Sequence, residues 1–161
     1  MKITKEWLKE KKACSEGVKW FKKQDKTDID DICRQLLKEN HFNWANWTLI
    51  HNMTYKQHVS YAVYAAELVL HIFEEKFPDD KRPRIAIEAA KKCIENPPKK
   101  NKELAKVAHA TDAAADAAAD AANAAHATHA AADAAYTAAD AKIKPKIIEY
   151  GIKLLEVNHE I

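Results

Sequence analysis

The stretch VAHATDAAADAAADAANAAHATHAAADAAYTAADA, residues 107–141, decides the fold class of this chain. Twenty-one of its thirty-five residues are alanine, and none is Lys, Arg, Gly or Pro. Alanine has the highest intrinsic helix propensity, so an uninterrupted run of this kind predicts α-helix. The polar residues recur every three or four positions: His109, Asp112, Asp116, Asp120, Asn123, His126, His129, Asp133, Tyr136 and Asp140. This spacing places a polar stripe on one helix face and alanine on the others, as expected for a helix that its neighbours approach closely.

The length of this stretch predicts an interruption. A single helix of thirty-five residues would be about 52 Å long, whereas a compact chain of this size has a radius of gyration of roughly 15 Å. The stripe keeps a near-heptad spacing from His109 to Asn123 and again from His126 to Asp140, with a shorter step between the two runs, so we expect a break or tight turn near residues 123–129. The sequence leaves open whether residues 107–141 form one helix or two.

The composition of the whole chain also favours helices. Two glycines in 161 residues are few for a fold in which tight turns join strands. The length suits one domain with a hydrophobic core. We therefore predict an all-α, compact single-domain helical bundle with long alanine-rich inner helices. Within it, residues 1–53 would form N-terminal helices, 54–141 the central helices and 142–161 a C-terminal helix.

Local signals place the other helices. Apolar residues predict a first helix over residues 4–21, bent or closely approached at Gly17, and a second over residues 28–39. Thr54 can cap a long helix that is apolar nearly all round. Asp79 or Asp80 can cap the next helix, which has Pro83 in its first turn, and Pro145 is expected to open the last helix.

The cysteine and hydropathy patterns indicate the compartment. Cys14, Cys33 and Cys93 are odd in number and far apart, as is typical of reduced thiols. The N-terminus has no secretory h-region, and no apolar run is long enough to cross a bilayer. We expect a cytoplasmic protein, in the host cell if the chain is phage-encoded, that binds no membrane.

Motifs for catalysis are missing from the sequence. There is no nucleotide-binding glycine motif, and no glycine turn that would build an oxyanion site beside a nucleophile. His126, His129 and Asp133 have a spacing that could hold a metal with help from another helix, but such residues are also common on solvated alanine helices. We expect no enzyme activity, no cofactor and no metal.

Three groups of residues are candidates for ligand contact. Lys81, Arg82 and Arg84 place three cations at a predicted helix N-terminus, where backbone N–H groups also favour anions. The alternative is that the two arginines pair with acidic neighbours and fix this corner. The other candidates are aromatic residues and stripe histidines, which could equally be core or solvated residues: Trp44, Trp47, Tyr136, His109, His126 and His129.

One stretch resembles a known family. The run YAVYAAELVLHIFEEKFPDDKRPRIAIEAAKK, residues 61–92, followed by the alanine-rich segment, resembles the alanine-rich helical immunity proteins associated with bacterial toxin systems. It is also similar to uncharacterised bacteriophage and prophage proteins, through the N-terminal pattern of Trp7, Ala13-Cys14, Gly17 and Trp20-Phe21 and the closing KIIEYGIKLLEV, residues 146–157. The first resemblance covers residues 55–141, and the second covers most of the chain.

The resemblance implies a non-enzymatic protein that neutralises a target by stoichiometric binding. It supplies no catalytic residues. A phage origin would imply counter-defence, either by docking on a host defence protein or by sequestering a small nucleotide signal. Nucleic acid is not favoured as a partner because basic and aromatic residues do not alternate along one face. A structural role as a homo-oligomer is a further alternative, since small residues at near-heptad spacing can pack helices between subunits.

Overall fold

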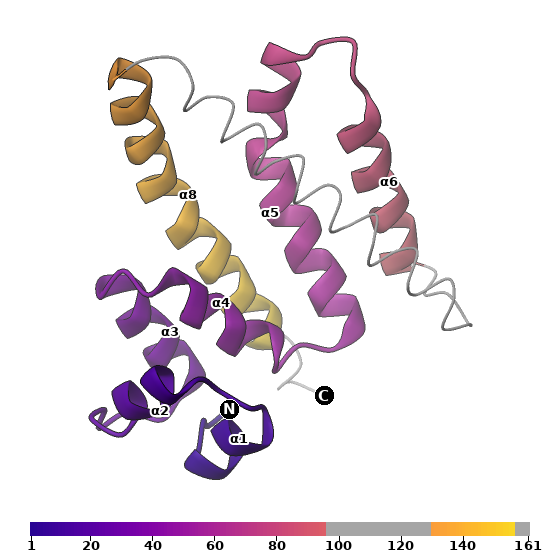
Figure 1. Ribbon diagram of the computed structural model, residues 1–161. Helices are drawn as coiled ribbons and strands as arrows, with labels where there is room; N and C mark the ends of the chain where they lie inside the picture. Colours follow the sequence, from indigo (N-terminus) through magenta and orange to yellow (C-terminus); the bar gives the residue numbers. More distant parts are fainter. Residues whose placement is uncertain (96–129, 157–161) are drawn as a thin grey trace. The chain divides into compact units, whose positions relative to one another are not determined.

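The computed structural model describes residues 1–95 and 130–156 (Figure 1). The elements assigned in this part of the chain are α-helices, and one isolated β-bridge joins Lys2 to Asp28. The predicted all-α class is therefore confirmed. The described residues form two compact units. The first comprises Met1–Met53 and the chain from Ile148 onward, and the second is Thr54–Ile147. The helices are α1 Lys5–Glu10, α2 Ser15–Phe21, α3 Ile29–Lys38, α4 Phe42–Ile50, α5 Tyr55–Lys76, α6 Arg82–Glu95 and α8 Ala130–Glu156.

The prediction of a single helix over residues 4–21 was wrong, because the chain turns between α1 and α2. Lys12 has a φ of 57°, in the left-handed region that L-residues other than Gly and Asn rarely adopt. The Lys12 N–H donates to the Lys9 carbonyl (3.1 Å), and the Ala13 N–H donates to the Leu8 carbonyl (2.9 Å). These two bonds form a Schellman motif, which ends α1. The break lies at Lys12, where no glycine or asparagine indicates it, rather than at Gly17.

The end of α3 has the same motif with a more usual residue. Asn40 has a φ of 61°. Its N–H donates to the Leu37 carbonyl (3.0 Å), and the His41 N–H donates to the Leu36 carbonyl (2.8 Å). The turn brings α4 back against α3. The α3–α4 hairpin buries Cys33, Ala45 and Leu49 completely.

The N-terminus and the last helix both attach to α3. The Ile3 N–H donates to the Thr27 carbonyl (2.7 Å), and the Ile29 N–H donates to the Met1 carbonyl (3.0 Å). The Arg34 guanidinium pairs with the Glu149 carboxylate of α8. The core of this unit includes Ile3, Leu8, Phe21, Ile32, Leu36, Ile148 and Ile152.

The second unit is built on α5 and α6, which pack against each other. The predicted cap of α5 is present as a capping box, in which the Thr54 hydroxyl accepts from the Gln57 N–H and the Gln57 side chain accepts from the Thr54 N–H. The apolar cluster between the two helices contains Val59, Val63, Ala66, Ile87 and Ala90.

The prediction that Pro145 opens the last helix was wrong, since Pro145 lies inside α8. A proline in a helix interior removes one backbone hydrogen bond and crowds the preceding turn. The alanine-rich segment that begins α8 at Ala130 is a strong helix former. Its helix propensity outweighs the cost of the proline, so the helix continues through Pro145. The C-terminal part of α8, from Ile148, belongs to the first unit.

Most of the alanine-rich stretch lies outside the described residues. This applies to residues 107–129, and therefore to the expected break near 123–129 and to His109, His126 and His129. Tyr136 lies in α8, but its side chain is outside the described part of the structure. No helix among the described residues is both long and apolar enough to span a membrane.

Candidate functional site

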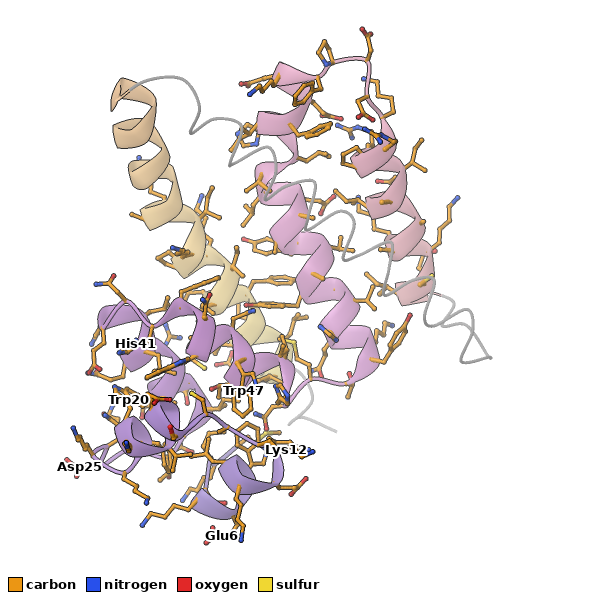
Figure 2. The ribbon with its side chains drawn as sticks, viewed as in Figure 1. Glu6, Lys12, Trp20, Asp25, His41 and Trp47 are labelled. Carbon is orange, nitrogen blue, oxygen red and sulfur yellow. The ribbon has the colours of Figure 1, made fainter. Side chains whose placement is uncertain are left out.

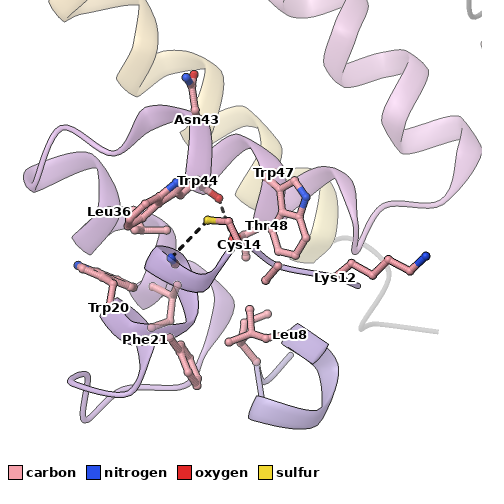
Figure 3. A pocket seen from close by; sticks show the side chains of 14 residues that line it. Leu8, Lys12, Cys14, Trp20, Phe21, Leu36, Asn43, Trp44, Trp47 and Thr48 are labelled. Atoms are coloured by element: carbon pink, nitrogen blue, oxygen red, sulfur yellow. Dashed lines mark hydrogen bonds between the residues drawn. The ribbon is translucent and has the colours of Figure 1, made fainter. Parts of the chain in front are cut away.

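A cavity of about 360 Å³ lies in the first unit, and Figure 3 shows its lining residues, among them Trp20 and Trp47, which Figure 2 labels on the whole chain. All four helices from α1 to α4 contribute to its walls, and its size falls within the usual range of ligand pockets, about 300–1,000 Å³. Four aromatic residues line it: Trp20, Phe21, Trp44 and Trp47. Trp44 and Trp47, predicted as contact residues, are thus brought together, and Trp20 joins them from α2.

The three indoles are held in place by different contacts. The Trp20 Nε1–H donates to Glu39 Oε2 at the end of α3. The Trp44 ring stacks on His41, with centroids 4.2 Å apart. Trp47 contacts the Trp7 ring edge-on at 5.5 Å. All three indoles are partly exposed, so they line the cavity without filling it.

Glycine and cysteine shape the wall formed by α2. The exposed Cys14 caps this helix, and its Sγ accepts a hydrogen bond from the Gly17 N–H at 3.4 Å. A Cβ added at Gly17 would lie 3.3 Å from that sulfur. Gly17 therefore supports a close approach, as the sequence predicted, and the partner in that approach is the Cys14 thiol.

Lys12 is the only charged residue among those that line the cavity within the described chain. Its aliphatic stem borders the cavity and its ammonium points outward (Figure 3). The backbone that places it there is the left-handed turn between α1 and α2. The polar remainder of the lining is small and neutral, from Asn43, Thr48 and Cys14. The cavity is thus apolar and aromatic, with one cation at its border.

Sequence reasoning did not identify Lys12, Cys14, Trp20 or Asn43 as site residues. Three of the four tryptophans of the chain line the cavity, so a concentration of tryptophan in the first 47 residues was the available signal. Lys12 gave no signal because a lysine in a lysine-rich segment is usually solvated.

The titratable groups beside the cavity have defined states. The hydrogen bond from Trp20, followed by the one from Gln35, lowers the pKa of Glu39, so this carboxylate is ionised at neutral pH. Burial raises the pKa of Cys33 to about 12. The Cys33 thiol is therefore protonated at neutral pH and supplies no thiolate nucleophile.

The cationic corner is separate from this cavity and belongs to the second unit. The Asp80 carboxylate accepts from the Arg82 backbone N–H (3.0 Å) and from its guanidinium Nε (2.9 Å). Arg84 bonds to Glu74 through Nε at 2.7 Å and Nη2 at 2.5 Å. Lys81 Nζ donates to the Pro78 carbonyl. An incoming anion would have to compete with these carboxylates, and anion binding at this corner stays a prediction.

A comparison with known families assigns the chain. The family model described as "Imm-5 like putative immunity protein" matches residues 48–161. The chain belongs to the Imm-5-like immunity protein family. No curated protein and no solved structure matches it.

The match to the Imm-5-like family model starts after nearly all of the residues that line the cavity. The match begins at residue 48 and includes all of α5, α6 and α8. Of the residues that line the cavity, Thr48 alone falls inside it. The aromatic cavity is therefore built, except for Thr48, by a segment that precedes the part of the chain matched by the family model.

Proposed function

We propose that this chain neutralises a toxin-type protein by forming a one-to-one complex with it, without chemical change to either partner. The observation that carries the proposal is the family match over residues 48–161. Immunity by binding needs a surface that recognises one partner and requires no reacting groups. A half-open aromatic cavity is suited to such recognition, because tryptophan is enriched among the residues that dominate binding energy.

The state of the side chains around the cavity also supports binding over catalysis. Cys33 is a protonated, fully buried thiol. His41 is stacked on Trp44, and the His51 Nδ1 lies 2.9 Å from the Trp47 carbonyl of its own helix. The two imidazoles contact the indoles of Trp44 and Trp47 and have the geometry of packing contacts.

Calorimetry tests this function. The full chain is titrated into the candidate toxin from the same gene neighbourhood, and both proteins are weighed intact by mass spectrometry before and after. We expect a saturable isotherm with one chain per toxin and unchanged masses. A mass change on the toxin, or no heat of binding together with no protection of cells, would contradict the proposal. The same titration can be repeated with a host defence protein in place of the toxin, and a saturable isotherm there would indicate phage counter-defence.

Sequestration of a small nucleotide signal is a second candidate function, favoured by one observation. The cavity has room for a base, and its indoles could stack on one. The lining supplies a single cation, Lys12, whereas a phosphate site usually has several donors. Native mass spectrometry of the freshly purified protein distinguishes the two, because a sequestered nucleotide would add its mass to the chain.

A further inference from the structure

We propose that the cavity of the first unit receives an aromatic side chain of the protein partner, and that an acidic residue next to this side chain pairs with Lys12. The inference rests on the proposed function and deepens it, because it names the contact surface and the chemistry that the partner presents there. The first support is shape. A cavity of about 360 Å³, lined in part by three partly exposed indoles, can hold one large planar side chain. Such anchor pockets commonly supply most of the energy of an interface.

The second support is charge. Lys12 borders the cavity, and no carboxylate is among the lining residues of the described chain. The lysine belongs to a segment, residues 1–27, with nine Lys against four acidic residues. Complementary potentials favour an acidic partner surface and raise its rate of association. A basic partner surface would meet repulsion at the same place.

The third support is the backbone of Lys12. A lysine held at a φ of 57° is less favourable than glycine at that position. Unfavourable backbone conformations that persist tend to occur at functional positions. Glycine would serve the turn better, whereas only a cationic side chain supplies the charge at the cavity border.

The fourth support is the position of the cavity in the chain. It is formed almost entirely by residues that precede the family match. A surface outside the matched segment is well placed to select one partner, while the matched segment supplies what the family shares. Arg82 and Arg84 are not part of this contact, because they do not line the cavity and their guanidinium groups are paired with Asp80 and Glu74.

The test uses ¹⁹F NMR on the full chain labelled with 5-fluorotryptophan, which gives one signal for each of the four tryptophans. Each signal is assigned with a Trp→Phe variant. The probes are three capped tripeptides: tryptophan between two aspartates, tryptophan between two lysines, and alanine between two aspartates. We expect the acidic tryptophan peptide to shift the signals of Trp20, Trp44 and Trp47 saturably, with a Kd on the order of 1 mM.

The expected contrasts are specific. The lysine-flanked peptide should bind about threefold more weakly or worse, and the alanine peptide should leave the three signals in place. Lys12→Gly should weaken the acidic tryptophan peptide about threefold without loss of fold, since glycine suits that backbone. Lys9→Ala, which removes an exposed lysine from α1 without lowering its helix propensity, is the control and should leave the affinity unchanged. Trp44→Ala, with its fold checked by circular dichroism, should abolish the shifts.

Three results would overturn the assignment: no shift of the cavity signals, equal shifts from the alanine peptide, or a small molecule that copurifies in the cavity at one per chain. These results are independent of the toxin. If the chain neutralises the toxin and both Lys12→Gly and Trp44→Ala neutralise it equally well, the cavity assignment is wrong and the proposed function stands. If the peptides bind as expected and the toxin does not, the proposed function is wrong.

Discussion

The indole of Trp7 meets the indole of Trp47 edge-on, with ring centroids 5.5 Å apart and an interplanar angle of 73°. This contact connects α1 to α4. The Trp47 ring also lines the cavity, whereas Trp7 does not. The position of one cavity wall therefore depends on a residue, Trp7, that does not line the cavity.

A double-mutant cycle measures that dependence. Trp7→Ala and Trp47→Ala, singly and together, should give a coupling of about 1 kcal/mol in the free energy of unfolding, as expected for an edge-to-face pair. Urea denaturation followed by circular dichroism gives the four values. The cycle between Trp7 and Trp20 is the control, because Trp20 is held by Glu39 instead. A coupling near zero for Trp7 and Trp47 would show that the two rings do not support each other.

The left-handed conformation at Lys12 predicts a stabilising substitution. Lys12→Gly should raise the free energy of unfolding by about 0.5–1 kcal/mol, because glycine adopts this φ without the cost that a side chain incurs. Asn40→Gly, at the equivalent position after α3, should change stability by a smaller amount, since asparagine tolerates this region. Thermal unfolding of the two variants makes the comparison. A lower melting temperature for Lys12→Gly would mean that Lys12 makes a stabilising contact in addition to its turn.

The corner before α6 predicts a dependence of stability on pH. The Arg82 guanidinium, followed by the Arg82 backbone N–H, lowers the pKa of Asp80 from its usual 3.8 to about 2. Because the pKa is lower in the folded state, the stabilisation from Asp80 is present above pH 3.8 and is lost as the pH falls through about 2.

Asp80→Asn should therefore be less stable than the wild type at neutral pH, and the difference should close as the pH falls toward 2. Thermal melts at intervals of pH check this, with the exposed neighbour variant Asp79→Asn as the control. The effect should be small, since the pair lies at the surface. A difference between wild type and Asp80→Asn that stays constant down to the acid limit would contradict the pairing with Arg82.

The three thiols predict a labelling order. Cys14 is exposed, Cys93 is half-buried and Cys33 is buried with its pKa raised to about 12. Iodoacetamide at neutral pH should therefore modify Cys14 first and leave Cys33 intact until the protein is denatured. Peptide mass mapping reads the order. Since Cys14 lines the cavity, a bound partner should slow its labelling and leave that of Cys93 unchanged. Early labelling of Cys33 would mean that α3 and α4 open in the native state.

The buried hydroxyl of Tyr55 predicts a gain in stability on its removal. The Tyr55 hydroxyl is buried without a hydrogen-bond partner in the described structure, and burial raises the pKa of this phenol. Tyr55→Phe should raise the free energy of unfolding by about 1 kcal/mol, because an unsatisfied buried hydroxyl is costly. Tyr55→Ala, which also removes the ring from the α5–α6 cluster, should lower it. Chemical denaturation of both variants gives the comparison, and a loss of stability in Tyr55→Phe would reveal a partner for the hydroxyl.

Much of the fold follows from short-range signals in the sequence. Thr54 and Gln57 have the spacing of a capping box, and the structure shows both of its bonds. Asp28 is the N-cap residue of α3, a residue type that favours this position, although its side chain makes no cap hydrogen bond. Such features depend on neighbouring residues alone, so a sequence can indicate them.

The missed features depend on tertiary context or on an unusual backbone. The turn at Lys12 has no glycine, so the apolar pattern of residues 4–21 predicts one helix. Pro145 was expected to begin a helix, but it lies inside α8 because the helix propensity of the alanine-rich segment before it outweighs the usual effect of proline. The cavity needs the turn at Lys12, since only a separate α2 brings Trp20 beside Trp44. Tryptophans can be counted in a sequence, but their convergence depends on that turn.

The central claim, neutralisation by one-to-one binding, is tested most directly by a titration of toxin activity. A fixed amount of the toxin, well above its Kd for the chain, is incubated with increasing amounts of the full chain, and the remaining toxin activity is measured at two widely separated times. We predict a linear loss of activity that reaches zero at one chain per toxin and is the same at both times. Complete neutralisation by a small fraction of an equivalent, growing with time, would contradict the account and show that the chain acts on its target as an enzyme.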